Sequence, residues 1–324
     1  MTPISWNLLK TFSEQGSRLE KLSGWLLSEV WSSSRYASLS SAEYLETGER
    51  MVNELEETLA RTAPRIYDEF ASNLPPEKDI SRFLEIENNA VVVFDGLSIR
   101  ELPALLKLAQ ESGFNVRETG TAYAATPSET LDFVEQRLHL DKVAPSQLSS
   151  RKELKTKGIE AYYFPHPGAR HEISVTARSL LMWSAFPDNK YTDSDARFPD
   201  LFCQIKEVLK SAWISTVQQI PKGRKILVTS DHGYVYFGPG MSFTRNQAEI
   251  RPLTQFFGGE RAKETRPGDV LPAHADLYIK NDKTAALIRG RVQCHPPGPN
   301  ASKLYKHGGM SFMEMFTPWL VLEN

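Results

Sequence analysis

The fold of this chain is decided by the stretch Lys225-Ile226-Leu227-Val228-Thr229-Ser230-Asp231-His232-Gly233. Residues 226–229 form a continuous apolar and β-branched run with polar flanks, which is typical of a buried strand in a parallel sheet. In open parallel sheets, ligands bind at the carboxyl ends of strands, so Asp231 and His232 are expected to face a crevice. The pair is either a ligand set for zinc or manganese or an ordinary polar turn.

Two further predicted strands also end in an acidic residue. Residues 89–94 form a second buried run that is followed by Asp95, and residues 180–186 form a third that is followed by Asp188. The carboxyl ends of parallel strands lie at one edge of a sheet. The carboxylates of Asp95, Asp188 and Asp231 are therefore expected to converge.

A hydroxyl-rich helix start and a late histidine extend this constellation. Residues 125–130, Ala-Thr-Pro-Ser-Glu-Thr, lead into a predicted helix that runs to about His139, and the first-turn N–H groups of a helix can hold an anion. His307, followed by two glycines, adds an imidazole. Two divalent metals held by carboxylates and imidazoles can polarise a phosphate and activate an oxygen nucleophile. The sequence therefore predicts a metal-dependent site for phosphate chemistry.

The composition narrows the class of protein. Of 324 residues, 40% are hydrophobic and 24% charged, and 38 basic against 40 acidic side chains leave a net charge of −2. This balance excludes a strongly basic nucleic-acid-binding surface over the whole chain, but not a local patch. Two cysteines cannot form a disulfide framework, which indicates a reducing compartment. Without a signal-like N-terminus or a membrane-length apolar run, a cytoplasmic protein with no membrane contact is expected.

The chain is expected to have two parts. Residues 1–85 are predicted to be helical and contain no catalytic constellation, so they serve packing or partner binding. Residues 86–324 alternate strands with helices, which predicts a three-layer α/β/α sandwich with a mostly parallel sheet. Between about 239 and 300 the chain is rich in glycine, proline and arginine, and this stretch is predicted to be an inserted, partly β region over the site.

The chain resembles a PglZ-domain protein, a branch of the alkaline phosphatase superfamily. The resemblance is carried by residues 91–101, 227–233 and 307–311, and it covers residues 86–324. It implies an alkaline-phosphatase-like fold and metal-dependent hydrolysis of a phosphodiester, in nucleic acid or in a nucleotide. PglZ proteins are associated with bacterial phage-defence systems of the phage growth limitation and BREX kinds. Other defence-system proteins are therefore the implied partners.

The resemblance also implies the ligands of two divalent ions, Zn2+ or Mn2+. Asp95, Asp231 and His232 resemble the ligands of one ion. Asp188 resembles the acidic ligand of the second ion, and His307 resembles its last histidine.

The nucleophile of the superfamily is a serine or a threonine. Residues 127–130, Pro-Ser-Glu-Thr, resemble the Pro-(Ser/Thr)-x-Thr of the nucleotide pyrophosphatase and phosphodiesterase members. This favours Thr130 as nucleophile, with Ser128 as second choice. A metal that lowers the pKa of a hydroxyl makes it nucleophilic near neutral pH.

One departure from the superfamily pattern affects the second ion. Four residues after Asp188, where the superfamily has a histidine, this chain has Thr192. Either Asp193 or Asp195 substitutes for it, or the second ion is held weakly. Because of this departure, the chain could instead be a degenerate, non-catalytic scaffold subunit of a defence complex. A third alternative is a phosphomonoesterase or phosphomutase on the same fold.

Basic residues are candidates for contacts to phosphate. Arg100, on the helix after Asp95, either binds a phosphate oxygen bidentately or is a solvated charge. The inserted region has a dense set of basic residues, which either line a path for a polyanion or are scattered surface charge. They are Arg245, Arg251, Arg261, Lys263, Arg266, Arg289 and Arg291.

Overall fold

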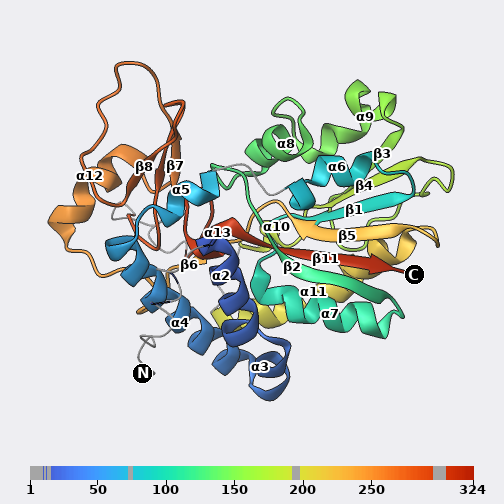
Figure 1. The fold of residues 1–324 in the computed structure, drawn as a ribbon, viewed down its shortest axis with the longest axis horizontal. Helices are drawn as coiled ribbons and strands as arrows, with labels where there is room; N and C mark the ends of the chain where they lie inside the picture. Colours follow the sequence, from blue (N-terminus) through green and yellow to red (C-terminus); the bar gives the residue numbers. More distant parts are fainter. Residues whose placement is uncertain (1–9, 11, 13–15, 72–75, 192–197, 295–303) are drawn as a thin grey trace.

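The computed structural model describes residues 10, 12, 16–71, 76–191, 198–294 and 304–324. Figure 1 shows a central sheet with helices on both faces and a smaller lobe beside it. The strands of the central sheet are β1 (Asn89–Phe94), β2 (Asn115–Tyr123), β3 (Ile159–Phe164), β4 (Ser179–Ser184), β5 (Lys225–Ser230) and β11 (Phe316–Glu323). Their order across the sheet is β2-β11-β5-β1-β4-β3.

The central sheet is mostly parallel, as predicted. β5, β1, β4 and β3 run parallel, whereas β11 is antiparallel to both of its neighbours, β5 and β2. Phe94 pairs with both Ser184 and Ser230, so β1, β4 and β5 end level with one another at one edge. β11, the last strand in the sequence, is thus inserted between β5 and β2.

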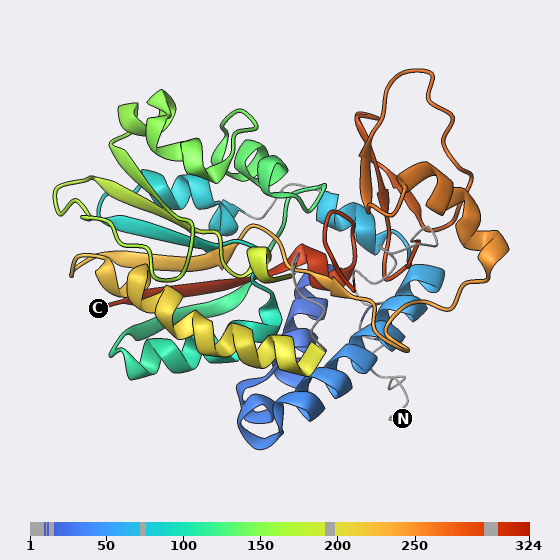
Figure 2. The ribbon, with the colours of Figure 1, turned by 180° about the vertical axis from the view of Figure 1, so that it is seen from behind.

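Helices cover both faces of the sheet, because successive side chains of a strand point to opposite sides. The helices are α6 (Ile80–Glu85), α7 (Leu102–Glu111), α8 (Thr130–Leu138), α9 (Lys152–Thr156) and α11 (Phe198–Ser215). Val92 and Phe94 of β1 share a buried cluster with α7 and α11, whereas Val91 and Val93 share another with α6, α8 and α9. The fold is therefore the three-layer α/β/α sandwich predicted from the sequence (Figures 1 and 2).

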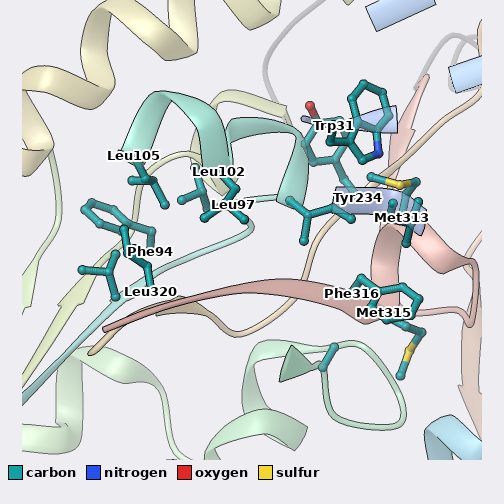
Figure 3. Close-up of a cluster of buried hydrophobic side chains, with 14 of the residues drawn as sticks. Trp31, Phe94, Leu97, Leu102, Leu105, Tyr234, Met313, Met315, Phe316 and Leu320 are labelled. Atoms are coloured by element: carbon teal, nitrogen blue, oxygen red, sulfur yellow. The ribbon is translucent and has the colours of Figure 1, made fainter. Parts of the chain in front are cut away.

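The described part of residues 1–85 is helical, as predicted. It forms α2 (Arg18–Trp25), η1 (Leu26–Val30), α3 (Ser33–Ser38), α4 (Ser41–Thr62), α5 (Ile66–Ala71), η2 (Pro76–Lys78) and α6. Ser40 begins α4 with a capping box, in which its hydroxyl and the Glu43 carboxylate each accept a backbone N–H of the other residue. Figure 3 shows Trp31 and Tyr234 in the buried cluster to which α7 contributes Leu102 and Leu105. These helices thus pack into the core of the sandwich, and a partner-binding role for them stays a prediction.

The smaller lobe is the described part of the predicted insertion. It contains α12 (Gln247–Phe257), β7 (Ala262–Glu264), β8 (Leu277–Ile279) and β9 (Ala285–Ile288). The strands form an antiparallel sheet in the order β7-β9-β8, and Leu253 and Ile288 lie in a separate small core. β6 (Val235–Tyr236) precedes the lobe in the sequence and β10 (Tyr305–Lys306) follows it, and the two pair as an antiparallel ribbon.

Short helical turns connect these elements. They are η3 (Ile99–Glu101), η4 (Pro145–Ser150), α10 (Asp188–Tyr191), η5 (Val217–Gln219) and α13 (Phe312–Met315). The turn η3 leads directly into α7, and at its start the Ser98 hydroxyl accepts from the backbone N–H of Arg100. Within the described ranges, no helix has both the length and the apolar character needed to cross a membrane.

Candidate metal centre

The ends of β1 and β5 bring together three side chains that we call the strand-end group: Asp95, Asp231 and His232. The Nε2 atom of His232 lies 3.7 Å from Oδ1 of Asp95 and 3.6 Å from Oδ2 of Asp231. The ligand atoms of the three residues all lie within 4.8 Å of one another. The structure therefore juxtaposes the three residues that the sequence suggests for one ion.

Hydrogen bonds orient the strand-end group. Nδ1 of His232 lies 2.9 Å from the carbonyl oxygen of Gly233, which only accepts, so Nδ1 is assigned the proton and Nε2 the lone pair. Nε2 is buried and has no hydrogen-bond partner in the described part of the chain. Oδ1 of Asp231 accepts from two backbone N–H groups at 2.9 and 3.0 Å, and Oδ2 of Asp95 accepts from Trp183 Nε1 at 3.1 Å. The second oxygen of each carboxylate, Oδ2 of Asp231 and Oδ1 of Asp95, is the one that lies near Nε2 of His232.

Asp188 and His307 form a second set, which we call the loop group. Asp188 begins α10, and His307 follows β10. His307 Nε2 lies 3.8 Å from Oδ1 of Asp188, an oxygen without a hydrogen-bond partner among the described residues. The rings of His232 and His307 stack with centroids 4.1 Å apart, and His232 also lies within 4.8 Å of both loop-group ligand atoms. His232 therefore lies close enough to both groups to serve either ion, and its assignment to the ion of Asp95 and Asp231 stays a prediction. The positions considered for a missing ligand, Thr192, Asp193 and Asp195, lie outside the described residues.

The spacing of these atoms fits cation binding within each group. Separations of 3.6, 3.7 and 3.8 Å exceed the roughly 3.2 Å limit of an N–H···O hydrogen bond. Two ligand atoms that each lie about 2.1 Å from a tetrahedral zinc ion are about 3.4 Å apart. Carboxylate and imidazole are also donors that zinc and manganese accept. The donor set thus fits one divalent cation at the strand-end group and a second, with fewer ligands, at the loop group.

The electrostatics of the site also favour a cation. Burial, together with the nearby carboxylates of Asp231 and Asp188, raises the pKa of Asp95 well above its usual value. Burial lowers the pKa of His307. The hydrogen bond to Glu129 and the negative charges of Glu129 and Asp188 have the opposite and larger effect, and the pKa of His307 rises to about 10. Several carboxylates crowded at one buried point repel one another, and a bound divalent cation relieves that repulsion.

Thr130 places a hydroxyl at the strand-end group. Its Oγ1 atom donates to Oδ2 of Asp231 at 2.8 Å and lies 3.5 Å from Oδ1 of Asp95. Thr130 is the first residue of α8, so the backbone of the helix start fixes where this hydroxyl lies. The residue favoured as nucleophile therefore contacts the carboxylates suggested as metal ligands.

Ser128, the second choice for the nucleophile, is bound elsewhere. Its buried hydroxyl accepts a hydrogen bond from Gly308 N and donates one to Gly309 O, both at 2.9 Å. Its carbonyl oxygen lies 3.2 Å from His307 Nδ1. Ser128 thus holds the chain that follows His307, and the structure does not support it as the attacking group.

Arg100 lies in the core, which corrects both expectations for it. Its side chain is 0% exposed, Nε donates to Glu49 Oε1 at 2.6 Å, and Nη1 donates to Tyr234 O at 2.9 Å. It is therefore neither a solvated charge nor a phosphate ligand in this structure. The sequence pattern could not indicate this, because its acidic partner lies on α4, 51 positions away.

Three of the basic residues suggested for a polyanion path or for scattered surface charge have another role. Arg261 and Arg291 are 2% and 0% exposed, and they form ion pairs with Glu314 and Glu49. Arg245 pairs with an aspartate of the same lobe at 2.8 Å. These three arginines hold the structure together, which neither a polyanion path nor scattered surface charge describes.

Glu129 was missed by the sequence reasoning. Its Oε2 atom lies 3.3 Å from Nδ1 of His307, and this contact turns Nε2 of the imidazole toward Asp188. A carboxylate behind a ligand histidine is a common arrangement in metal sites. The available signal was its place as the variable residue in Pro-Ser-Glu-Thr, directly before Thr130.

Two cavities adjoin Glu129. One, of about 210 Å³, lies at the loop group, and Tyr191, Tyr234 and Tyr305 line it together with Lys306. The other, of about 580 Å³, lies between the start of α8 and the lobe and has lining side chains of both charges. Residues of the lobe therefore border the second of these cavities.

Comparisons with known proteins give distant likenesses. No protein-family model and no curated protein matches the chain. Among solved structures, murine ectonucleotide pyrophosphatase/phosphodiesterase 5 covers 72% of this chain and 88% of its own, at 14% identity and a TM-score of 0.46. Phosphonoacetate hydrolase from Sinorhizobium meliloti 1021, in complex with phosphonoacetate, covers 73% and 90%, at 11% identity and a TM-score of 0.39. Likenesses this distant do not indicate a function for this chain.

Proposed function

We propose that this chain is a metal-dependent phosphodiesterase of the alkaline phosphatase superfamily, in its PglZ branch. The observation that carries the proposal is the position of the Thr130 hydroxyl, 2.8 Å from Oδ2 of Asp231 and 3.5 Å from Oδ1 of Asp95. A hydroxyl in contact with the carboxylates that would hold a cation is suited to nucleophilic attack on phosphorus. The buried Nε2 of His232 at the same point, which has no hydrogen-bond partner among the residues that the structure describes, supports the cation.

The chain's own residues then have separate roles. The strand-end group would hold one Zn2+ or Mn2+ ion, and the loop group a second. Such ions lower the pKa of a hydroxyl and neutralise charge on a phosphate. Thr130 Oγ1, having lost its proton to solvent, forms a bond to phosphorus while the bond to one ester oxygen breaks, and that oxygen takes a proton from solvent. Water then cleaves the phosphothreonine and restores the hydroxyl.

We propose that the substrate is a phosphodiester in nucleic acid or in a nucleotide. The cavity of about 210 Å³ at the loop group supports this, because it gives a substrate a place beside the proposed ions, and Lys306 lines it together with the carboxylates of Glu129, Asp188 and Glu260. The resemblance to PglZ proteins adds the setting: phage defence in the bacterial cytoplasm, with other defence proteins as partners.

The test is a pair of substitutions at one position. Thr130→Ala is expected to lower the kcat for an aryl phosphodiester with added Mn2+ or Zn2+ by about 10³-fold or more, because the nucleophile is lost. Thr130→Ser keeps a hydroxyl and is expected to retain measurable activity. Both variants should melt within a few degrees of the wild type, because the start of α8 does not depend on this side chain for a cap.

Two outcomes would count against the proposal. Full activity of Thr130→Ala would remove Thr130 as nucleophile. A metal-loaded wild type that cleaves none of several diesters would favour the non-catalytic scaffold.

A further inference from the structure

We infer that Arg261, in the lobe, is a positioning residue for His307 and acts through Glu314. The inference rests on the proposed function, because it concerns the second ion, which His307 would hold. His307 is followed by Gly308 and Gly309, and glycine gives a backbone more freedom than any other residue. A ligand on such a segment stays in place only if neighbouring elements hold the backbone.

The carboxylate of Glu314 holds this segment. Its Oε1 accepts a hydrogen bond from Gly309 N and its Oε2 accepts one from Ser311 N, both at 2.9 Å. Arg261 donates to the same two oxygens, from Nε at 2.6 Å and from Nη2 at 2.8 Å. Both side chains are shielded from water, at 0% and 2% exposure. The bidentate pair therefore fixes the carboxylate that in turn fixes the backbone after His307.

Arg261 is itself tied to the lobe. Its Nη2 atom donates to Gly290 O at 2.7 Å, and its Nη1 atom donates to Val292 O at 3.1 Å. These carbonyl groups lie just after β9. One guanidinium thus joins the end of a lobe strand to the segment that carries the loop-group histidine. A lysine has no planar fork and could not make both sets of contacts.

Gly309 gives independent support. A Cβ atom built there would lie 2.7 Å from Nη2 and 2.8 Å from Nε of Arg261, so the backbone lies directly against the guanidinium. On its other side, the hydroxyl of Ser128 bonds to Gly308 N and Gly309 O. The segment is therefore clamped between the start of α8 and the lobe. Loss of either clamp frees His307 to move away from Asp188.

The experiment is a titration of metal-free, full-length protein with Co2+ alone, followed by visible absorption and calorimetry. Arg261→Gln removes the fork, and Glu314→Gln leaves a single acceptor oxygen for two backbone N–H groups. Each variant is expected to weaken the second Co2+ ion by about 10- to 100-fold, the usual effect of losing a group behind a metal ligand. The first ion should change by less than about twofold, because the hydrogen bonds of the Arg261 guanidinium and of the Glu314 carboxylate go to the lobe and to the segment after His307, and none goes to a side chain of the strand-end group.

Arg245→Gln is the matched control. Arg245 also forms a partly buried ion pair in the lobe, with Asp276, but its hydrogen bonds go to Asp276, to Glu57 and to its own segment. Both cobalt affinities are expected to stay at wild-type values in this variant. If Arg261→Gln does not fold, as judged by circular dichroism, Arg261→Lys replaces it, since it keeps the charge and loses the fork.

Three results would overturn the inference: a wild type with one cobalt site, a folded Arg261 variant that binds both ions normally, or equal weakening of both ions. Equal weakening would indicate general damage to the site. The readout is independent of catalysis. A wild type that binds two Co2+ ions and cleaves no diester would remove the proposed function while leaving this inference in place.

Discussion

The two groups of the candidate metal centre lie on different structural supports. The strand-end group lies at the ends of β1 and β5, where its three side chains are 13%, 0% and 1% exposed. The loop group lies on a one-turn helix and a glycine-rich segment, where its two side chains are 26% and 28% exposed. Ligands on paired strands lose little further freedom when an ion binds, whereas ligands on loops must be ordered. We therefore expect one tight and one weak ion.

The largest expected effect comes from the strand-end group. Asp231→Asn removes a charged ligand but keeps an oxygen acceptor for the two backbone N–H groups, so the fold should persist. We expect loss of the tight ion and a fall in diesterase kcat of about 10³-fold or more. Metal content after gel filtration, measured with the kinetics, checks this. Asp132→Asn, on α8 and paired with Lys142, is the control, and an equal loss there would contradict the assignment.

The loop group should give a smaller and separable effect. His307→Ala is expected to abolish the weak ion, to leave the affinity for the tight ion within about twofold, and to lower kcat by about 10²-fold. Calorimetric titration of stripped wild type should show two affinities, and dialysis should remove only the weaker ion. Two equally tight ions in the wild type would mean that the supports of the two groups do not matter.

A group behind the strand-end ligands should give a smaller effect again. Trp183→Phe removes the N–H that donates to Oδ2 of Asp95 but keeps an aromatic ring against Phe133. We expect the tight ion to bind about tenfold more weakly, with no change in the weak ion. Trp213→Phe, which removes a similar bond to Ser112 Oγ at 3.0 Å, is the control. If both variants bind the tight ion normally, the indole does not orient Asp95.

The smallest effect on the site should come from Glu56, behind α13. Burial raises the pKa of Glu56 from 4.5 to about 8, while its Oε1 accepts from Phe312 N at 2.8 Å. Between pH 4.5 and 8 the folded protein holds a proton that the unfolded chain has released, so this group makes stability fall as the pH rises.

Glu56→Gln should therefore match the wild type near pH 4 and exceed it above pH 8, by on the order of 1–4 kcal/mol in free energy of unfolding. Urea midpoints at both pH values measure this. Ion affinities should change by less than about twofold. A stability difference that does not vary with pH would show that Glu56 ionises normally in the folded chain.

Much of the fold could be predicted because its signals are local. The run at β5 and the similar run at β1 are apolar on both faces, which only a strand covered by two helical layers tolerates. Acidic residues directly after such strands then place Asp95 and Asp231 at one edge, since parallel strands end together. These local signals allowed the sequence to suggest that Asp95, Asp231 and His232 are neighbours. The sequence suggested Thr130 with them because a helix start is also a local signal.

Other features were decided only by the tertiary structure. The sequence suggests a surface or substrate-binding role for Arg100, but in the folded chain α4 places Glu49 against it. The sequence suggests a surface charge of the lobe for Arg261, but in the folded chain it forms an ion pair with Glu314. The sharing of His232 between two groups and the capture of the Ser128 hydroxyl by Gly308 likewise depend on segments far apart in the chain. Periodicity and strand ends are properties of short stretches, which the sequence determines by itself. The partner of a buried charge or hydroxyl depends on which distant segment packs against it, and only the folded chain determines that.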